Sequence, residues 1–419
     1  MSKSICILGL GYIGLPTALL FAKEGNTVLG VDIDQDKIQK LNQEILPFEE
    51  TGLKKLYENA KHNFTASTST KPSDVFLIAV PTPITKEKKC DLRYVVAATN
   101  SIKNHLKKGD LVILESTVRP RTTIDIVKPI LEETGLICGQ DFFLAYVPEK
   151  AIPGKTLEEM QNNHRLIGGI TKSCAQRAKE LYTFVKTDMP ITSATTCETV
   201  KLFENTYRDV NIALANEFKI LSKDFKINVH EAIRYANKHP RVNIHSPGPG
   251  VGGHCIPIDP YFLIDSTKSK NSLIEKSRSL NNQMPDHAVE FILIKINPNA
   301  KIALCGLSYK ANVDDDRESP SYQIYEQLTQ KGYDIIIIDP YFTNKKHPKI
   351  KKQSNTIKNV NTLIIATNHK EFEEFSAKDF EDSPVHTIID LKSCLKNKQE
   401  LQNKNITIHT FGDYSWKLH

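Results

Sequence analysis

The residue best suited to chemistry is a cysteine at the end of a glycine-rich segment. Residues 246–255 read SPGPGVGGHC, and Asp259 follows four positions after Cys255. Four glycines within six positions allow the backbone to come close to a ligand and to offer it N–H donors. A thiol in that setting, with a carboxylate nearby, is suited to nucleophilic catalysis through an acyl-enzyme. The alternatives are a buried, structural Cys255, or His254 acting as its base, although adjacent side chains usually point apart.

A second segment predicts a nucleotide site. Residues 9–14 read GLGYIG and stand between an apolar run of strand length and a helical pattern. Glycines in this arrangement allow a tight turn and let the backbone approach a pyrophosphate at the N-terminus of the helix. Asp32 ends the next strand about 20 residues on, where a carboxylate can bind the ribose 2′-OH, and Asp34 is a nearby competitor. An acidic residue there disfavours a 2′-phosphate, so we expect NAD rather than NADP.

Two further segments follow strand-like runs. Residues 80–83 read VPTP and residues 115–118 read ESTV. Both are expected at the carboxyl edge of a parallel sheet, where ligands bind in this architecture. Either segment taken alone is also explained by turn formation.

The elements that must position these residues follow an α/β plan at both ends of the chain. Strands are expected at residues 5–8, 27–31, 75–80, 111–114, 302–305, 334–338, 362–366, 387–389 and 406–409. Helices are expected at residues 13–24, 194–226, 229–237 and 321–329, with another helical run after residue 259 to about 296. The alternation predicts parallel sheets with helices on both faces. Residues 194–226 predict one long helix, because apolar residues recur every three or four positions without Pro or Gly.

We therefore expect an α/β fold of two Rossmann-like, doubly wound domains joined by a long central helix and a helical dimerisation region. The expected domains are residues 1–193, which bind NAD, residues 194–298, which carry the cysteine loop, and residues 299–419. The last domain has GLSYK at 306–310 in place of GxGxxG, which is consistent with a nucleotide ligand other than a dinucleotide.

Composition excludes several classes of protein. Of 419 residues, 40% are hydrophobic and 25% charged, as in ordinary globular proteins. The net charge of +6 is spread along the chain without a basic stripe, so we expect no nucleic acid partner. No signal peptide and no apolar run of about 18 residues is present, so no membrane association is expected. Eight cysteines without a CxxC pair argue against zinc and fit a reducing cytoplasm, and we expect no metal.

The motifs together resemble one family. PGPGVGGHCIPIDP, GLGYIG, VPTP, EST, PEKAIPG, KLFENTYRDVNIALANE and GLSYKANVDDDRESP occur in the order found in the UDP-glucose/GDP-mannose dehydrogenase family. The resemblance covers essentially the whole chain. It implies an NAD-dependent enzyme that oxidises a UDP-sugar in two hydride transfers, with residues 299–419 binding the UDP-sugar.

The resemblance implies a catalytic set centred on the cysteine. Cys255 attacks the aldehyde formed by the first oxidation, and the adduct is oxidised to a thioester that water releases as the acid. Lys201 stabilises the developing alkoxide as a fixed cation. Asn205, one turn later on the same helix face, helps hold that oxygen or its water. Asp259 acts with a water as base.

The segment around Glu149 bears on both mechanism and substrate. The resemblance implies that Glu149 and Thr117 position the hydrolytic water or the base. Relatives that act on UDP-glucose commonly carry a second glutamate where Pro153 stands, whereas the acetamido-sugar branch has proline there. Residues 237–245 (NKHPRVNIH) most resemble the branch that acts on UDP-N-acetylmannosamine. These features favour a UDP-N-acetylhexosamine over UDP-glucose.

The resemblance also implies binding residues and an assembly. The cofactor-binding residues are Gly11, Tyr12, Ile13, Asp32, Thr82, Thr117 and Arg317. The substrate-binding residues are Lys201, Asn205, Arg241, His245, Gly252, Tyr309 and Lys310. Lys310 is assigned to the uridine diphosphate, and Arg241 reaches the sugar nucleotide across a subunit boundary. The long helix is expected to build a homodimer or a higher homo-oligomer.

Several alternatives remain at this point. The substrate could be UDP-N-acetylglucosamine or UDP-glucose in place of the manno epimer. A single-step β-hydroxyacid dehydrogenase shares the N-terminal fold and a helix lysine, but the cysteine loop and the second α/β domain argue against it. A non-catalytic NAD-binding regulatory protein would not be expected to keep Lys201, Cys255 and Asp259 together. By resemblance, the product is a uronic acid for surface polysaccharide.

Overall fold

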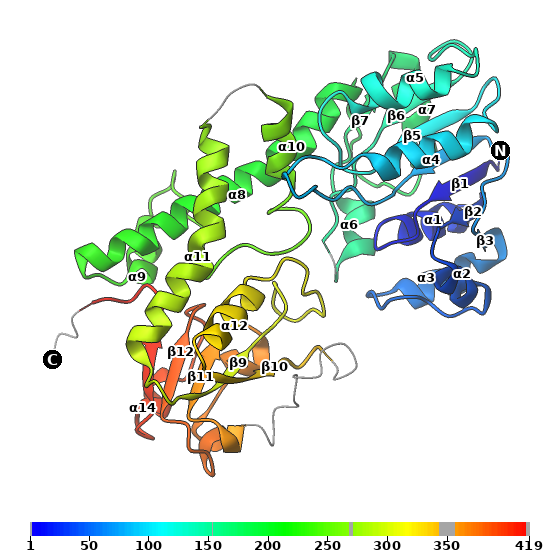
Figure 1. Ribbon diagram of the computed structural model, residues 1–419. Coiled ribbons are helices and arrows are strands. Elements are labelled where there is room, and N and C mark those ends of the chain that lie inside the picture. Colours follow the sequence, from blue (N-terminus) through cyan, green and yellow to red (C-terminus); the bar gives the residue numbers. More distant parts are fainter. Residues whose placement is uncertain (1, 153, 268–270, 343–356, 416–419) are drawn as a thin grey trace. The chain divides into compact units, whose positions relative to one another are not determined.

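A computed structural model describes residues 2–152, 154–267, 271–342 and 357–415 (Figure 1). The chain divides into two compact units, residues 1–204 with 261–268, and residues 205–260 with 269–419. Each unit contains one β-sheet. Pro153, which bears on the predicted substrate, lies outside the described residues.

The first unit contains an eight-stranded sheet in the order β3-β2-β1-β4-β5-β6-β7-β8. Its strands are β1 (Ser4–Leu8), β2 (Thr27–Val31), β3 (Phe64–Ser67), β4 (Val75–Ile78), β5 (Leu111–Leu114), β6 (Phe143–Tyr146), β7 (Ile167–Gly169) and β8 (Ile191–Ser193). Neighbouring strands run parallel, except that β7 is antiparallel to β6. The four strands predicted in this region are confirmed, although β4 ends two residues earlier than expected.

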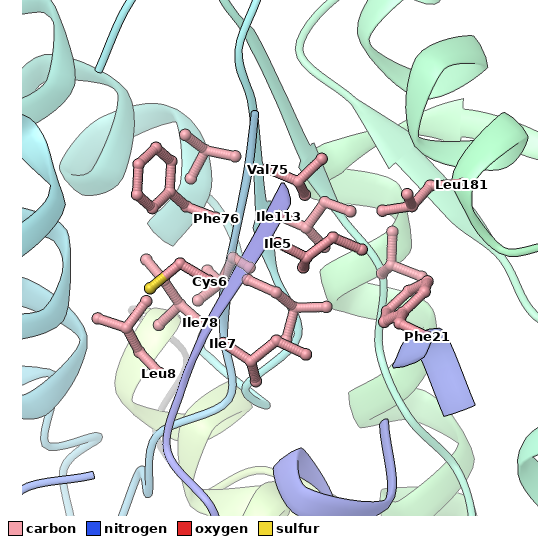
Figure 2. Packing of buried hydrophobic residues seen from close by; sticks show 14 of the residues in the cluster. Ile5, Cys6, Ile7, Leu8, Phe21, Val75, Phe76, Ile78, Ile113 and Leu181 are labelled. Carbon is pink, nitrogen blue, oxygen red and sulfur yellow. The ribbon is translucent and has the colours of Figure 1, made fainter. Parts of the chain in front are cut away.

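Helices cover both faces of this sheet, because its central strands are apolar on both sides. The helices are α1 (Gly14–Lys23), α2 (Gln35–Asn42), α3 (Leu53–Ala60), α4 (Arg93–Lys103), α5 (Lys128–Glu132), α6 (Thr156–Asn162) and α7 (Lys172–Leu181). Figure 2 shows Cys6 and Phe76 pointing to one side of the sheet, while Ile5 points to the other side with Phe21 and Leu181. All five are buried, as expected for parallel strands covered on both faces.

The second unit contains a five-stranded, fully parallel sheet in the order β10-β9-β11-β12-β13. Its strands are β9 (Lys301–Cys305), β10 (Asp334–Ile338), β11 (Thr362–Ile365), β12 (Thr387–Asp390) and β13 (Thr407–Thr410). Helices α11 (Leu273–Lys295) and α12 (Pro320–Gln330) pack on one face. Helices α13 (Lys370–Glu373) and α14 (Lys398–Gln402) pack on the other. The predicted fold class, two Rossmann-like sheets with a long central helix, is confirmed.

The long helix is α8 (Ala194–Phe225), within one residue of the prediction, and α9 (Val229–Ala236) follows it. Residues 194–204 of α8 belong to the first unit and residues 205–225 to the second. The helical run expected from residue 259 to about 296 is instead two helices, α10 (Asp259–Ser266) and α11. A new helix begins at α11 because Ser272 and Glu275 form a capping box.

Candidate active site

The turn after β1 has the geometry of a pyrophosphate site. Gly9 has a φ of +95°, and a Cβ on Gly14 would lie 1.8 Å from the carbonyl oxygen of Gly9. Both positions therefore require glycine for the turn itself. A Cβ on Gly11 would meet nothing within 4 Å. Because α1 begins without a side-chain cap or an acidic residue in its first turn, its N–H groups and the open space at Gly11 fit an anion.

Asp32 lies after β2 with one oxygen bound to this turn. Its Oδ2 accepts the backbone N–H of Leu10 at 2.9 Å and pairs with Lys37 Nζ at 2.6 Å. Although burial opposes the effect, the hydrogen bonds from Lys37 and from the backbone N–H groups of Asp34 and Leu10 lower the pKa of Asp32. It is therefore charged at neutral pH. The competitor Asp34 caps α2 by accepting the N–H of Lys37, which leaves Asp32 as the better ribose ligand.

The loops after β4 and β5 are tied to each other. Thr82 Oγ1 donates to the carbonyl oxygen of Thr117 at 2.6 Å, and Ser116 Oγ donates to that of Val80 at 2.7 Å. Because the two strands are adjacent and parallel, these bonds fix both segments at the carboxyl edge. The predicted residues Thr82 and Thr117 are thus brought together. Tyr12 of the glycine turn packs against Phe48, with ring centroids 4.3 Å apart.

Lys201 stands in the first third of α8, which is anchored by Glu198. The Glu198 carboxylate accepts the backbone N–H groups of Arg121 (2.6 Å) and Thr123 (2.7 Å) and the Thr123 hydroxyl (2.6 Å). Lys201 is only 7% exposed, and its ammonium makes no hydrogen bond or ion pair with any residue that the structure describes. A buried cation held in place without a partner is suited to receive an anionic or developing oxygen.

Glu149 follows β6 and belongs to the same unit as Lys201. Its Oε1 accepts the backbone N–H groups of Lys150 (2.7 Å) and Ala151 (2.8 Å), and its Oε2 pairs with Arg165. The side chain is nearly fully buried. Both oxygens are therefore held, which fixes the direction of this carboxylate.

In the second unit, the cysteine loop packs against the turn after β9. A Cβ on Gly252 would lie 2.6 Å from that of Tyr309, and one on Gly253, whose φ is +92°, would lie 2.8 Å from the Tyr309 ring. The Gly253 N–H also donates to the carbonyl oxygen of Arg317 at 2.8 Å. These positions must be glycine because the loop approaches Tyr309 too closely for a side chain. Burial, followed by the charges of Asp315 and Cys255, raises the pKa of Tyr309 to about 12, so its hydroxyl remains a donor.

Asn205 and Asp259 meet beside the cysteine. Asn205 Nδ2 donates to Asp259 Oδ2 at 2.5 Å, and the Asp259 N–H donates to the carbonyl oxygen of Cys255 at 2.9 Å. Asn205 is 8% and Asp259 3% exposed, while Cys255 is half-buried. The structure thus brings together three predicted catalytic residues: Asp259 contacts Cys255 through the backbone and Asn205 through its side chain.

A buried polar chain supports the start of the cysteine loop. Asn216 Oδ1 accepts the N–H of Gly248 at 2.8 Å, and its Nδ2 donates to Asn281 Oδ1 at 2.9 Å. Asn281 Nδ2 donates in turn to Asp209 Oδ1 at 2.8 Å, and Asp209 also pairs with Arg278. The four side chains are at most 2% exposed. Buried polar groups are costly when unpaired, so this chain favours one arrangement of α8, α11 and the loop.

The other predicted substrate residues lie toward solvent. Lys310 and Arg241 are exposed, and His245 is half-buried. Arg317 is exposed and held by a two-point ion pair with Asp315, at 2.8 and 2.6 Å. Exposed cations of this kind can meet a diphosphate without losing a structural role.

Three residues at these sites were not predicted from the sequence: Arg165, Asn216 and Lys392. Lys392 Nζ lies 3.4 Å from the position that a Cβ on Gly248 would take, so a cation stands at the glycine loop. Burial lowers its pKa. No local pattern marks Arg165, and Asn216 resembles the other polar residues on α8.

Among the described residues, no group of three or more His, Cys, Asp or Glu is placed to hold a metal ion. No helix within the described ranges combines the length and apolarity that a bilayer crossing requires. The cysteines predicted to be small core residues, Cys6 and Cys305, are fully buried.

The glycine turn and Asp32 have the geometry of a dinucleotide site, as expected for the NAD-binding domain of a dehydrogenase. Models of the UDP-glucose/GDP-mannose dehydrogenase family match the chain in three segments: the NAD binding domain at residues 3–186, the central domain at 195–283 and the UDP binding domain at 303–397. The chain belongs to the UDP-glucose/GDP-mannose dehydrogenase family. The predictions of the family, of an NAD-dependent UDP-sugar dehydrogenase and of NAD as cofactor are confirmed.

Individual relatives agree over nearly the full chain. A UDP-N-acetyl-D-mannosamine dehydrogenase from Methanococcus aeolicus is 43% identical over 421 residues, covering 98% of this chain and 93% of that protein. The structure of a UDP-N-acetyl-mannosamine dehydrogenase from Staphylococcus aureus is 42% identical, with a TM-score of 0.88 and 98% of each chain covered. That of a UDP-D-ManNAc dehydrogenase from Pyrococcus horikoshii is 36% identical, with a TM-score of 0.89, covering 99% of this chain and 100% of that one.

Two glycines of the turn after β1 should respond differently to substitution by alanine. Gly11→Ala should leave the free energy of unfolding within about 0.5 kcal/mol of the parent, because no protein atom meets the new Cβ. It should weaken NAD binding by roughly 1–3 kcal/mol, since the methyl group enters the ligand space. Gly14→Ala should destabilise the fold, because its Cβ clashes with the Gly9 carbonyl. Thermal unfolding and NAD titration separate the two; equal NAD affinity of Gly11→Ala and the parent would contradict the pyrophosphate site.

The buried polar chain should contribute to stability through Asn216. Asn216→Leu leaves the Gly248 N–H buried without an acceptor, which should lower the free energy of unfolding by about 1–3 kcal/mol. Urea titration measures the loss. Asn211→Leu is the control, because the Asn211 amide donates only to the Tyr207 carbonyl of its own helix and should cost less than about 0.5 kcal/mol. Equal stability of the two variants would show that Asn216 does not hold the loop.

Proposed function

We propose that this protein oxidises UDP-N-acetyl-D-mannosamine at C6 to UDP-N-acetyl-D-mannosaminuronic acid, using two NAD per sugar. The observation that carries the proposal is the cysteine loop. Cys255 stands in a glycine loop pressed against Tyr309, with Asp259 and Asn205 hydrogen-bonded to each other beside it. A thiol so placed serves as a covalent anchor for an aldehyde.

The chain's own residues account for the steps between the oxidations. Lys201 stabilises the alkoxide of the substrate, and Asn205 holds the same oxygen or its water. The Cys255 thiolate bonds to the aldehyde carbon, which keeps a reactive intermediate in place and gives a thiohemiacetal. After its oxidation to the thioester, Asp259 accepts a proton from water, and Glu149 with Thr117 orients that water. The C–S bond then breaks, and the thiolate leaves with the carboxylate formed. Gly11, Tyr12, Ile13, Asp32, Thr82 and Arg317 would hold NAD, which would supply the hydride acceptor for both oxidations.

The manno epimer is favoured by two observations. The relatives described above are named for UDP-N-acetylmannosamine. Residues 237–245 most resemble the branch that acts on UDP-N-acetylmannosamine, while Pro153 favours an acetamido sugar over glucose. Lys310, Tyr309, His245 and Gly252 are assigned to the sugar nucleotide. The alternatives are UDP-N-acetylglucosamine and then UDP-glucose.

We assign the NAD-binding role to residues 1–193, the central role to 194–298 and UDP-sugar binding to 299–419. In the cell we place the reaction in the cytoplasm, where the uronic acid would supply surface polysaccharide synthesis.

A panel of UDP-sugars tests the substrate. NADH absorbance at 340 nm should rise most with UDP-N-acetylmannosamine, and two NADH should form for each sugar consumed. Cys255→Ser should abolish net turnover, because an oxygen nucleophile at this position forms no thioester. Cys394→Ser, at a half-buried cysteine of the same unit, is the matched control. One NADH per sugar with an aldehyde product, or full activity in Cys255→Ser, would refute the mechanism.

We also propose that α8 builds a homodimer. Five large apolar side chains remain exposed on α8: Phe203 (59%), Tyr207 (65%), Leu214 (43%), Leu221 (38%) and Phe225 (64%). Their spacing of four, seven, seven and four residues places them on one helix face. A continuous apolar stripe on the surface is typical of an interaction site, and a two-fold dimer would cover it with its own copy. Arg241 would then reach the partner's substrate.

Light scattering tests the assembly, with an expected mass of twice that of the chain. The double variant Leu214→Glu with Leu221→Glu should give monomers, because it places like charges on both copies of the stripe. Lys223→Glu, an exposed change on the opposite side of α8, should remain dimeric. A monomeric parent protein would overturn the dimer and the cross-subunit role of Arg241.

A further inference from the structure

A buried charged cluster lies behind Glu149 in the first unit. Arg165, two residues before the start of β7 and 4% exposed, pairs through Nη2 with Glu149 Oε2 and through Nη1 with Glu115 Oε1 at 3.2 Å. Its guanidinium lies over the ring of Tyr182, 4.9 Å from the centroid. One arginine thus connects two carboxylates that follow the adjacent strands β5 and β6.

Arg165 completes the immobilisation of Glu149. Backbone N–H groups occupy Oε1 of Glu149, so without Arg165 the carboxylate could still turn about that anchor. A guanidinium offers its donors in a fixed planar fork, which a lysine ammonium does not reproduce. Arg165 therefore fixes the direction of Oε2 as well as supplying a compensating charge.

Glu115 holds Arg165 from the other side. Its Oε1 also accepts the Tyr182 hydroxyl, and its Oε2 accepts the Thr17 hydroxyl of α1, both at 3.4 Å. The neighbouring Thr117, on the same loop, is assigned to the water or the base. Arg165 and Glu115 therefore connect helix α1, the loop that carries Thr117, and Glu149.

The cluster is sensitive to protonation near neutral pH. Burial raises the pKa of Glu115 to about 7, with Arg165 opposing the shift and the Glu149 charge adding to it. The groups that face Glu115 are Arg165, Glu149, Tyr182 and Thr17. As pH falls through this range, Glu115 takes up a proton and Arg165 is left with Glu149 as its only charged partner.

We propose that Arg165 is a positioning residue for thioester hydrolysis: it fixes the carboxylate of Glu149, and Glu115 fixes Arg165. The inference rests on the proposed function, in which Glu149 orients the hydrolytic water. It assigns no contact between Arg165 and the substrate. Arg165 acts only through Glu149.

The test compares Arg165→Lys, Glu115→Gln and Glu149→Gln in the full-length protein with NAD and UDP-N-acetylmannosamine. In Arg165→Lys the first NADH burst should persist, while steady-state turnover falls roughly 10²-fold, the effect of a misplaced catalytic group. Acyl-enzyme on Cys255 should accumulate, as detected by intact-protein mass spectrometry. KM for NAD should change little. Arg177→Lys is the control, because Arg177 stacks on Phe143 in the same unit without touching a carboxylate.

Glu115→Gln provides a second readout that a purely structural role would not move. In the parent, the hydrolysis rate should show an inflection near pH 7 as Glu115 titrates. In Glu115→Gln this inflection should be absent, and the variant should behave at all pH values like the parent below the inflection. This variant keeps the side-chain volume, so it remains informative if Arg165→Lys does not fold.

Four outcomes would overturn the proposal. The first is parent-like turnover in Arg165→Lys. The second is activity lost only in proportion to folded protein, with no acyl-enzyme. The third is an unchanged pH profile in Glu115→Gln. The fourth is normal hydrolysis in Glu149→Gln, which removes the role through which Arg165 acts. If no enzyme, including the parent, passes through a Cys255 thioester, the proposed function itself fails, which is a distinguishable result.

Discussion

The turn after the first strand of each sheet is held by the same kind of hydrogen bond, from a backbone N–H to an aspartate carboxylate. Asp32 Oδ2 accepts the N–H of Leu10 at 2.9 Å, and Asp339 Oδ2 accepts that of Leu307 at 2.7 Å. Each aspartate directly follows the second strand of its sheet, and each leucine follows a glycine with a positive φ, +95° and +100°. The bond fixes a backbone that L side chains rarely adopt, at the sheet edge where ligands bind.

The two aspartates differ in what remains available for a ligand. Asp32 pairs with Lys37 and keeps 10% of its side chain exposed, so it can exchange a partner for a ribose. Asp339 is fully buried, with His369 Nε2 at 3.2 Å and a second backbone N–H, from Ser308. The hydrogen bonds of Asp339 Oδ2 are made to Leu307, Ser308 and His369, and they stabilise the fold. The turn in the first sheet can therefore bind a dinucleotide. In the second sheet the side chains available to a ligand lie beyond the turn, at the exposed Lys310 and Arg317.

The elements that could be predicted from the sequence are those marked by a local pattern of residue types. Strands such as β4 and β5 are buried on both faces, so they appear as continuous apolar runs, and the cysteine loop and glycine turn are recognised by spacing. β7 escaped because two of its three residues are glycines. The separation of α10 from α11 was not predicted, because the apolar periodicity of a helix resumes in α11. Arg165 and Asn216 could not be predicted, because their partners lie 16 to 65 positions away and chain folding alone brings them together.

Asn216, which escaped prediction, and Tyr309, which did not, both help to make the glycine loop rigid. Glycine has the largest conformational entropy to lose, so a loop rich in glycine needs fixed surroundings if its thiol is to be placed. Tyr309 supplies a surface that excludes side chains at Gly252 and Gly253, and Asn216 fixes the loop's start. Arg165 does for Glu149 what these contacts do for Cys255. Buried polar side chains such as Asn216 and Arg165 thus fix the cysteine loop and Glu149, and their roles become apparent only in the folded chain.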